Sequence, residues 1–262
     1  MLCVLRFGLY SVLISLILSL VALPFVPLTW WRIFRRCASI GAFVSLWICV
    51  KNVEGRSLRS YGLSGAGKWQ ILIGLLFGLS VLALMLGIGL ASGVYVIELT
   101  PHPAKFWRVV LGFLPAALLI SVLEELIFRG FLLQQLLSVS RPLAVILSSA
   151  VYAAVHLRSS TLTLATWMEL GGLFLLGGVL SMSYLLTGRL YLSLGLHAAL
   201  AYGARINKLL IGIPHTSLTW LVGTSRLVNG VMTWVAILLL AGLVAGWARI
   251  SHQRGGVTHG RS

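Results

Sequence analysis

The sequence predicts an all-α fold, a polytopic bundle of about eight transmembrane helices. Composition predicts it first, because 59% of the 262 residues are hydrophobic, only 10% are charged, and the mean hydropathy is +1.00. A soluble domain carries about 25% charged residues, so the apolar excess in this chain must face lipid. The second observation is that the apolar residues form long runs, and a helix needs roughly 20 such residues to cross a bilayer.

Eight apolar runs follow one another along the chain. Four are strong candidates for spanning helices: Phe7–Leu23, Ile71–Ile97, Leu170–Gly188 and Leu227–Ala248. Four others are short or interrupted by polar residues: Trp30–Val50, Phe106–Leu137, Pro142–Leu157 and Leu190–Ile211. The first run follows Arg6 as a signal peptide would, but its apolar core is longer than the roughly 7–15 residues of such a peptide, and we take it as a span.

These runs divide the chain into three parts without a soluble domain. Residues 1–108 hold the first three spans, residues 109–213 hold spans four to seven with the motifs described below, and residues 214–262 hold the last span and a basic tail. Pro214–Arg226 is predicted to be a loop or a re-entrant segment. Gly74xxxGly78 predicts close helix packing in the third span.

The net charge of +15 does not predict a nucleic-acid partner. The basic residues stand singly or in small groups between apolar runs, as anchors at a membrane surface do. The three cysteines, Cys3, Cys37 and Cys49, have irregular spacing and no CxxC pair, which is typical of small buried hydrophobic residues.

Three ionisable residues on one predicted span mark a functional site, because charge inside a membrane is costly. Glu125 and Arg129 are four residues apart in the order that favours an ion pair on a helix. The side chain of Glu124 points about 100° away from that of Glu125. We therefore expect Arg129 to neutralise Glu125, and Glu124 to face a cavity and serve as a general base.

Two histidines lie in other spans. Counted from the same membrane surface, Glu124 lies about 20 Å deep, 13 residues before Leu137, and His156 about 21 Å deep. His197 is only about 11 Å deep by this count. The depth of His197 fits the site only if its helix starts earlier or tilts, or if His197 reaches the cavity from the side.

These residues resemble the motifs of a known family. Glu124-Glu125-xxx-Arg129, then Tyr152-xxx-His156, then His197 are similar, in order and on separate spans, to the EExxxR, FxxxH and H motifs of the CPBP family. This family contains the CAAX prenyl endopeptidase and bacterial Abi-type proteins. The resemblance covers roughly Val109 to Tyr202.

The resemblance implies an intramembrane peptidase of the glutamic type, with its catalytic cavity within the membrane. It implies that Glu124 activates water, that His156 and His197 orient the water and stabilise the oxyanion, and that Glu125, Arg129 and Tyr152 support them. It implies no metal and no cofactor; the partners would be a membrane-inserted or lipidated peptide and the lipid bilayer, in a bacterial cytoplasmic membrane.

The chain departs from the family pattern at two positions. Tyr152 replaces Phe, and Ala201 replaces the Asn that often follows the last histidine by four residues. Two alternatives therefore stay open. One is a metal-dependent peptidase that uses the same Glu and His residues, and the other is a non-enzymatic membrane protein, such as an immunity or scaffold protein or a proton-coupled carrier.

Overall fold

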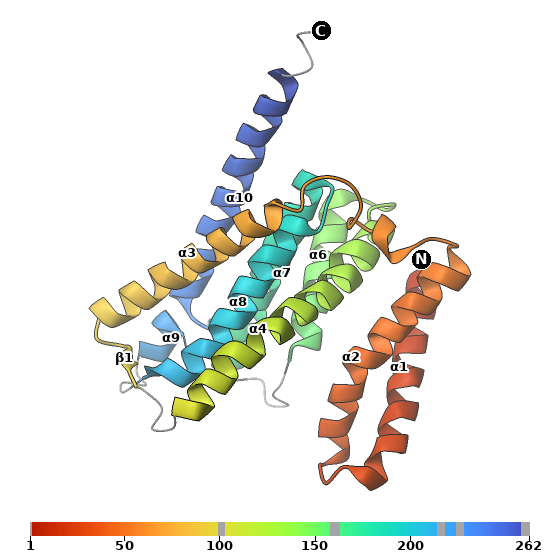
Figure 1. The fold of residues 1–262 in the computed structure, drawn as a ribbon, viewed down its shortest axis with the longest axis horizontal. Helices are drawn as coiled ribbons and strands as arrows, with labels where there is room; N and C mark the ends of the chain where they lie inside the picture. The colour runs from red at the N-terminus through yellow and green to blue at the C-terminus, as the bar shows by residue number, and fades with distance from the viewer. Residues whose placement is uncertain (1, 99–102, 158–162, 214–217, 224–227, 258–262) are drawn as a thin grey trace.

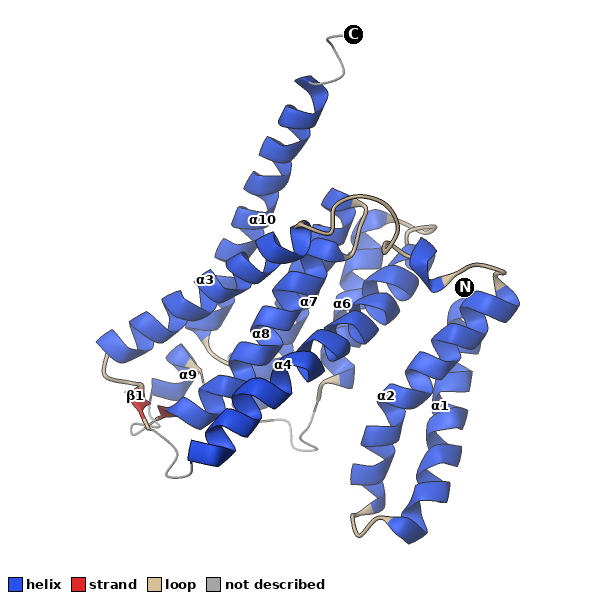
Figure 2. Cartoon of the chain, in the orientation of Figure 1, coloured by secondary structure: helices blue, strands red, loops and turns tan. Residues whose placement is uncertain are grey.

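The structure is a computed structural model that describes residues 2–98, 103–157, 163–213, 218–223 and 228–257. It is a bundle of helices with one minimal pair of strands (Figures 1 and 2). In the first half the elements are α1 (Leu2–Ala22), η1 (Leu23–Phe25), α2 (Trp30–Ile48), η2 (Cys49–Val53), η3 (Leu58–Ser60), α3 (Gln70–Ala91) and β1 (Val96–Ile97). In the second half they are α4 (Pro103–Glu125), η4 (Leu126–Leu133), α5 (Gln134–Leu136), α6 (Arg141–Val155), α7 (Leu164–Thr187), α8 (Tyr191–Leu210), β2 (Ile211–Gly212), α9 (Thr219–Val222) and α10 (Val231–Val257).

The predicted all-α membrane architecture is confirmed. Within the described residues, six helices are long and apolar enough to cross a membrane: Leu2–Phe25, Trp30–Val53, Gln70–Ala91, Phe106–Leu136, Leu164–Thr187 and Val231–Ser251. The 15 residues of α6 form a shorter apolar helix, and the 20 residues of α8 correspond to the predicted seventh span. The eight predicted runs thus match eight helical segments, and the protein is an integral, multi-pass membrane protein.

The third predicted span is too long at its C-terminal end. The helix α3 ends at Ala91, and Gly93 adopts the positive φ of 71° that commonly terminates a helix. Val96–Ile97 is a strand that pairs antiparallel with Ile211–Gly212.

The predicted loop Pro214–Arg226 is described only in part. Residues 218–223 of it are described, and they contain α9. Residues 214–217 and 224–226 lie outside the described residues, as does the end of the basic tail at 258–262.

Small residues seat α8 against α3, as the Gly74xxxGly78 pattern predicts. A Cβ on Gly74 would lie 2.2 Å from the carbonyl oxygen of Leu192, and one on Gly195 would lie 2.1 Å from that of Ile71. The two backbones therefore touch directly. This contact fixes the position of α8, which carries His197.

The predicted span Phe106–Leu137 is not a single regular helix. It is α-helical up to Glu125, π-helical through η4, and α-helical again in α5. All eight residues of η4 are buried. Short π-helical segments are rare and frequently mark functional sites, and this one begins directly after the two glutamates.

The helices α1 and α2 form a hairpin beside the rest of the bundle (Figure 1). The hairpin meets the core near η4, where the rings of Phe7 and Phe131 lie 5.2 Å apart. The side chain of Glu54 accepts hydrogen bonds from Cys3, Tyr61 and Gln135. It thereby joins three parts of the chain, which are α1, the connection between α2 and α3, and α5.

Candidate active site

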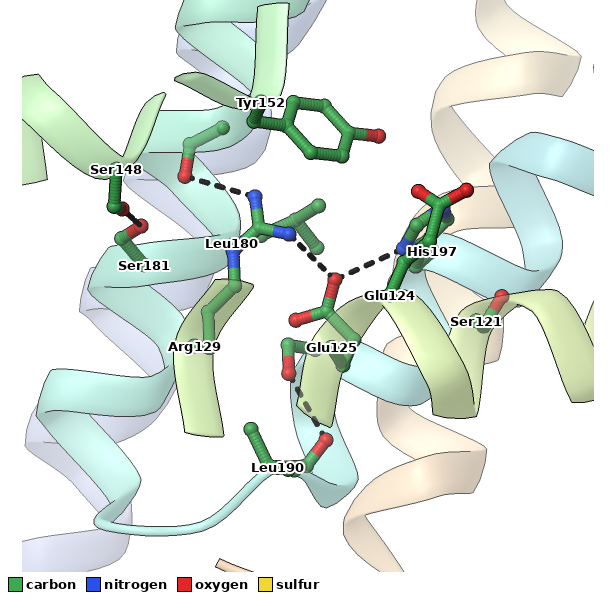
Figure 3. Close-up of polar contacts among 12 residues, drawn as sticks. Ser121, Glu124, Glu125, Arg129, Ser148, Tyr152, Leu180, Ser181, Leu190 and His197 are labelled. Carbon is green, nitrogen blue, oxygen red and sulfur yellow. Dashed lines mark hydrogen bonds and ion pairs between the residues drawn. The ribbon is translucent and has the colours of Figure 1, made fainter. Parts of the chain in front are cut away.

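A fully buried ion pair lies at the centre of the bundle. Arg129 Nη1 donates to Glu125 Oε1 at 2.8 Å, with side-chain exposures of 1% and 0% (Figure 3). This is the pair that the spacing of four residues predicts. The other terminal nitrogen of Arg129 donates to the carbonyl oxygen of Gly177 on α7 at 3.2 Å, so the guanidinium also ties η4 to α7.

The aromatic ring of Tyr152 covers the guanidinium of Arg129. The central carbon of that guanidinium lies 4.6 Å from the ring centroid, a favourable cation–π distance. The ring of Tyr152 also contacts Phe128, His156 and His197, with centroids 5.1, 4.4 and 6.1 Å away. The ring of Tyr152 therefore packs against both the guanidinium of the buried ion pair and the two histidines.

Glu124 faces both histidines. Its Oε2 lies 3.3 Å from Nε2 of His156 and 3.6 Å from Nε2 of His197. The side chains of Glu124 and His156 are about a quarter exposed, 25% and 24%, whereas His197 is buried. The helix that carries Glu124 was expected to hold no cationic partner for it. In the structure two imidazoles lie beside Glu124, that of His197 from α8 and that of His156 from the end of α6.

His197 bridges the two carboxylates, which corrects the expected mismatch in depth. Its Nδ1 lies 2.9 Å from Glu125 Oε1 while its Nε2 faces Glu124 (Figure 3). The helix α8 begins at Tyr191, so it does not start earlier than expected. The two depths, each counted along its own helix axis from the helix end, therefore did not give the true relative position of the two side chains.

His156 does not lie inside its helix as predicted. The helix α6 ends at Val155, and His156 is its C-cap residue. Its Nδ1 lies 2.7 Å from the carbonyl oxygen of Tyr152, four residues earlier. The end of a 15-residue helix, only about 22 Å long, thus places an imidazole beside Glu124.

The hydrogen-bond partners of both histidines define their tautomers. The carbonyl oxygen of Tyr152 and the ionised carboxylate of Glu125 can only accept, so Nδ1 carries the hydrogen in each ring. A neutral His156 and a neutral His197 then both present a bare Nε2 to Glu124. Three acceptors this close to one another repel unless one of them carries a proton.

The formal charges of the cluster also favour one additional proton beside Glu124. Glu124 and Glu125 carry two negative charges and Arg129 carries one positive charge, so one further proton on the Glu124 and histidine side makes the cluster neutral. A neutral cluster is favoured where charge is poorly solvated. A proton on Glu124 or on one of the two imidazoles would therefore balance the charge of the cluster.

The sequence analysis missed the polar and backbone groups around Arg129. The Gly177 carbonyl was not foreseen, although Gly177 belongs to a glycine-rich stretch of α7 that signals close packing. A Cβ on Gly177 would lie 3.0 Å from Ser149 of α6, so that contact needs a residue without a side chain. Nearby, the hydroxyls of Ser148 and Ser181 lie 3.3 Å apart across the same interface (Figure 3).

Other features limit what the site can bind. Ala201, one turn after His197, presents a methyl group where the family often has an amide. Among the described residues, no group of three or more His, Cys, Asp or Glu side chains has the arrangement of a metal site.

A comparison with known families covers this part of the chain. Residues 106–203 match the family model described as Rce1-like, type II CAAX prenyl endopeptidase. The matched region runs from α4 to α8 and includes Glu124, Glu125, Arg129, His156 and His197. A search of curated proteins found no match to this chain. The match, which covers a little over a third of the chain, and the motifs within it support the assignment to the CPBP/CAAX family of intramembrane proteases.

Proposed function

We propose that this protein is an endopeptidase that cleaves membrane-inserted or lipid-anchored peptides with a water activated by Glu124. The observation that supports the proposal best is the position of Glu124 Oε2, which lies 3.3 and 3.6 Å from the Nε2 atoms of two histidines. Oε2 itself is buried, on a side chain that is 25% exposed. Neither contact has hydrogen-bond geometry, and Oε2 has no hydrogen-bond partner among the described residues. A water bound beside Oε2 would have these three polar groups as neighbours.

In the first step, Glu124 takes a proton from that water as the water oxygen attacks the carbonyl carbon of the scissile peptide bond. A positioned general base contributes typically 10²–10⁴-fold to such a reaction. The carbonyl π electrons move to oxygen, and the tetrahedral intermediate carries a negative charge there.

In the second step, whichever of His156 and His197 holds the additional proton of the cluster donates its Nε2–H to the oxyanion. Such a donor acts strongly in a site that excludes most water. When the intermediate collapses, the carbon–nitrogen bond breaks and Glu124 returns its proton to the leaving amine. The products are a carboxylic acid and an amine, which become a carboxylate and an ammonium when the acid proton passes to the amine, and the site regains its starting protonation.

Glu125, Arg129 and Tyr152 support this chemistry without contact to the reacting atoms. Glu125 accepts from Nδ1 of His197 and so orients its Nε2 toward Glu124. Arg129 balances the charge of Glu125. Tyr152 holds Nδ1 of His156 through its backbone and packs its ring against both imidazoles.

The substrate class follows from the family and from the membrane position of the site. The matched family is described by its action on prenylated CAAX substrates, and prenylated peptides are therefore the first substrates to test. Ala201 lowers the polarity of the site relative to the family pattern, so peptides with other lipid anchors belong in the same panel. The bacterial origin expected from the sequence stays a prediction.

A metal-dependent peptidase is the second candidate, and one observation favours it. Both histidines have Nδ1 bound to an oxygen acceptor and Nε2 turned toward Glu124, which is how metal-ligating histidines are usually held. The residues that would hold a zinc ion are Glu124, His156 and His197, and the ion would supply the activation of water. The arrangement of these side chains in the structure is not that of a metal site, which favours the first candidate.

One experiment separates the two candidates. The purified protein in detergent is incubated with a panel of prenylated, acylated and unmodified peptides, and products are identified by mass spectrometry with and without EDTA. We expect cleavage of a lipid-bearing peptide at an unchanged rate after chelation. Loss of cleavage that zinc alone restores would establish the metal-dependent reaction, and an absence of cleavage of every peptide would contradict the peptidase proposal itself.

A further inference from the structure

The outer half of the α1–α2 hairpin, at the end farthest from η4, is held by its own two helices (Figure 1). The hydrophobic cluster around η4 takes side chains from α1 only up to Tyr10 and from α2 only from Ala42 onward. No side chain from 11 to 41, a stretch that the structure describes in full, belongs to a hydrophobic cluster of the bundle. The surroundings of this outer half must therefore come largely from outside the protein.

Three arginines gather at the start of α2. Arg32, Arg35 and Arg36 are all exposed, and their spacing places them on one side of the helix, within an arc of about 100°. The buried Ile33 and Cys37 lie on a different side of the same helix. The result is a dense and solvent-facing group of guanidinium side chains, which we call the arginine cluster.

An aromatic stack occupies the other flank of the same helix turns. The ring of Phe34 lies 5.4 Å from that of Trp30 and 5.7 Å from that of Trp31, between ring centroids. Trp30 and Trp31 are nevertheless 41% and 56% exposed. Exposed tryptophans are enriched where a membrane meets water, at the level of the lipid headgroups. The arginine cluster on the neighbouring flank therefore lies at the same level.

Contacts within the protein do not account for the arginine cluster. No carboxylate of the described residues lies within ion-pair distance of any of its three guanidinium groups. The first turn of α2 holds no acidic residue, and Thr29 at its N-cap makes no side-chain hydrogen bond. Positive charges repel one another and are unfavourable near the positive end of a helix dipole. An anion from outside the chain would remove both penalties.

We propose that Arg32, Arg35 and Arg36 form a binding site for the phosphate groups of anionic phospholipids, which hold the outer half of the hairpin at the membrane surface. A guanidinium presents N–H groups in a fork that fits two phosphate oxygens. A lipid is favoured over a soluble phosphate because the aromatic stack lies at the depth where lipid phosphates are concentrated. This site is separate from the candidate active site and does not depend on the proposed peptidase reaction.

The test measures lipid binding directly. The purified protein in detergent is titrated with phosphatidylglycerol or with uncharged phosphatidylcholine, and the lipid that stays bound is counted by native mass spectrometry. One arginine near an anionic lipid surface contributes about five-fold to the affinity. For the variant with all three arginines replaced by Gln we therefore expect an affinity for phosphatidylglycerol about a hundred-fold lower, with little change for phosphatidylcholine.

A matched variant separates the site from general charge. Replacing Lys51, Arg56 and Arg59 by Gln removes the same charge from exposed positions at the opposite end of the hairpin and should leave the affinity within a few-fold of the wild type. Replacing the arginine cluster by three lysines keeps the charge without the planar forks and should keep part of the affinity.

Thermal unfolding gives a second readout, with a sign that a purely structural role would not produce. Without lipid, the Gln variant of the arginine cluster should be at least as stable as the wild type, because the repulsion at the start of α2 is removed. With phosphatidylglycerol, the unfolding temperature of the wild type should rise more than that of the variant, because a ligand stabilises the form that binds it.

Three results would overturn the proposal. The first is equal affinity of the wild-type protein for phosphatidylglycerol and phosphatidylcholine. The second is an affinity for phosphatidylglycerol that falls equally in the cluster variant and in the matched variant, which would reduce the effect to net charge. The third is displacement of phosphatidylglycerol by inorganic phosphate in excess, which would make the cluster a site for a soluble anion. None of these measurements uses peptide cleavage, so their outcome is independent of the peptidase proposal.

Discussion

Two neighbouring glutamates on one helix end lie in opposite environments. Glu125 is fully buried and paired with Arg129 at 2.8 Å, whereas Glu124 is 25% exposed and faces two imidazoles. One step of about 100° around the helix axis produces this difference. The comparison teaches that residues of identical chemistry, adjacent in sequence, separate into a buried carboxylate paired with arginine and a partly exposed carboxylate beside two imidazoles, because of what packs against each face.

The sharpest contrast comes from Glu124→Gln. The amide has the same shape but takes no proton from water, so turnover should fall by at least 10²–10⁴-fold. The unfolding temperature should stay close to that of the wild type, because Glu124 is not part of the buried ion pair. Peptide cleavage and thermal unfolding in detergent measure both. Retention of turnover would remove Glu124 from the proposed mechanism.

A change at Glu125 should act first on stability. Glu125→Gln leaves Arg129 buried without its carboxylate, and breaking one side of a buried pair costs about 3–5 kcal/mol in soluble proteins. We expect a large drop in the unfolding temperature and a secondary loss of activity. Replacing Glu125 by Gln and Arg129 by Met together removes the unpaired charge and should recover part of the stability. A stable but inactive Glu125→Gln protein would reverse the two roles.

Tyr152→Phe should have the smallest effect. It keeps the ring that covers Arg129, and it introduces the residue that the family pattern has at this position. We expect a stability change below about 1 kcal/mol and turnover within a few-fold of the wild type. Tyr152→Leu, the matched control, loses the aromatic face and should be clearly less stable by thermal unfolding. Equal stability of the two variants would show that the ring contributes nothing through its face.

Local rules predicted much of the fold and part of the site. The apolar runs predicted the helices because a spanning helix needs a minimum apolar length. The pairing of Glu125 with Arg129 follows from a spacing of four residues, which is a property of the helix itself. The motifs predicted that His156 and His197 gather near Glu124.

Other features leave no trace in an apolar pattern. Leu126–Leu133 has the composition of an ordinary helix, and the π-helical pattern depends on which carbonyl each N–H selects. Val96–Ile97 continues the apolar run of α3, so its pairing with Ile211–Gly212 was hidden. The carbonyl of Gly177 is a backbone acceptor, present at every residue, and only the fold decides that Arg129 reaches it.

The number of residues in the π-helical segment η4 determines how the side chains before it and after it are oriented relative to one another. Each residue added to or removed from a helix turns everything beyond it by about 100°. A deletion between Glu125 and Arg129 would rotate the two side chains apart and break their ion pair. A deletion after Arg129 would instead rotate Gln135 away from Glu54, to which it donates a hydrogen bond. Insertions and deletions here should therefore be far more damaging than exchanges of one apolar residue for another, and related chains should keep a constant number of residues between Glu125 and Gln135.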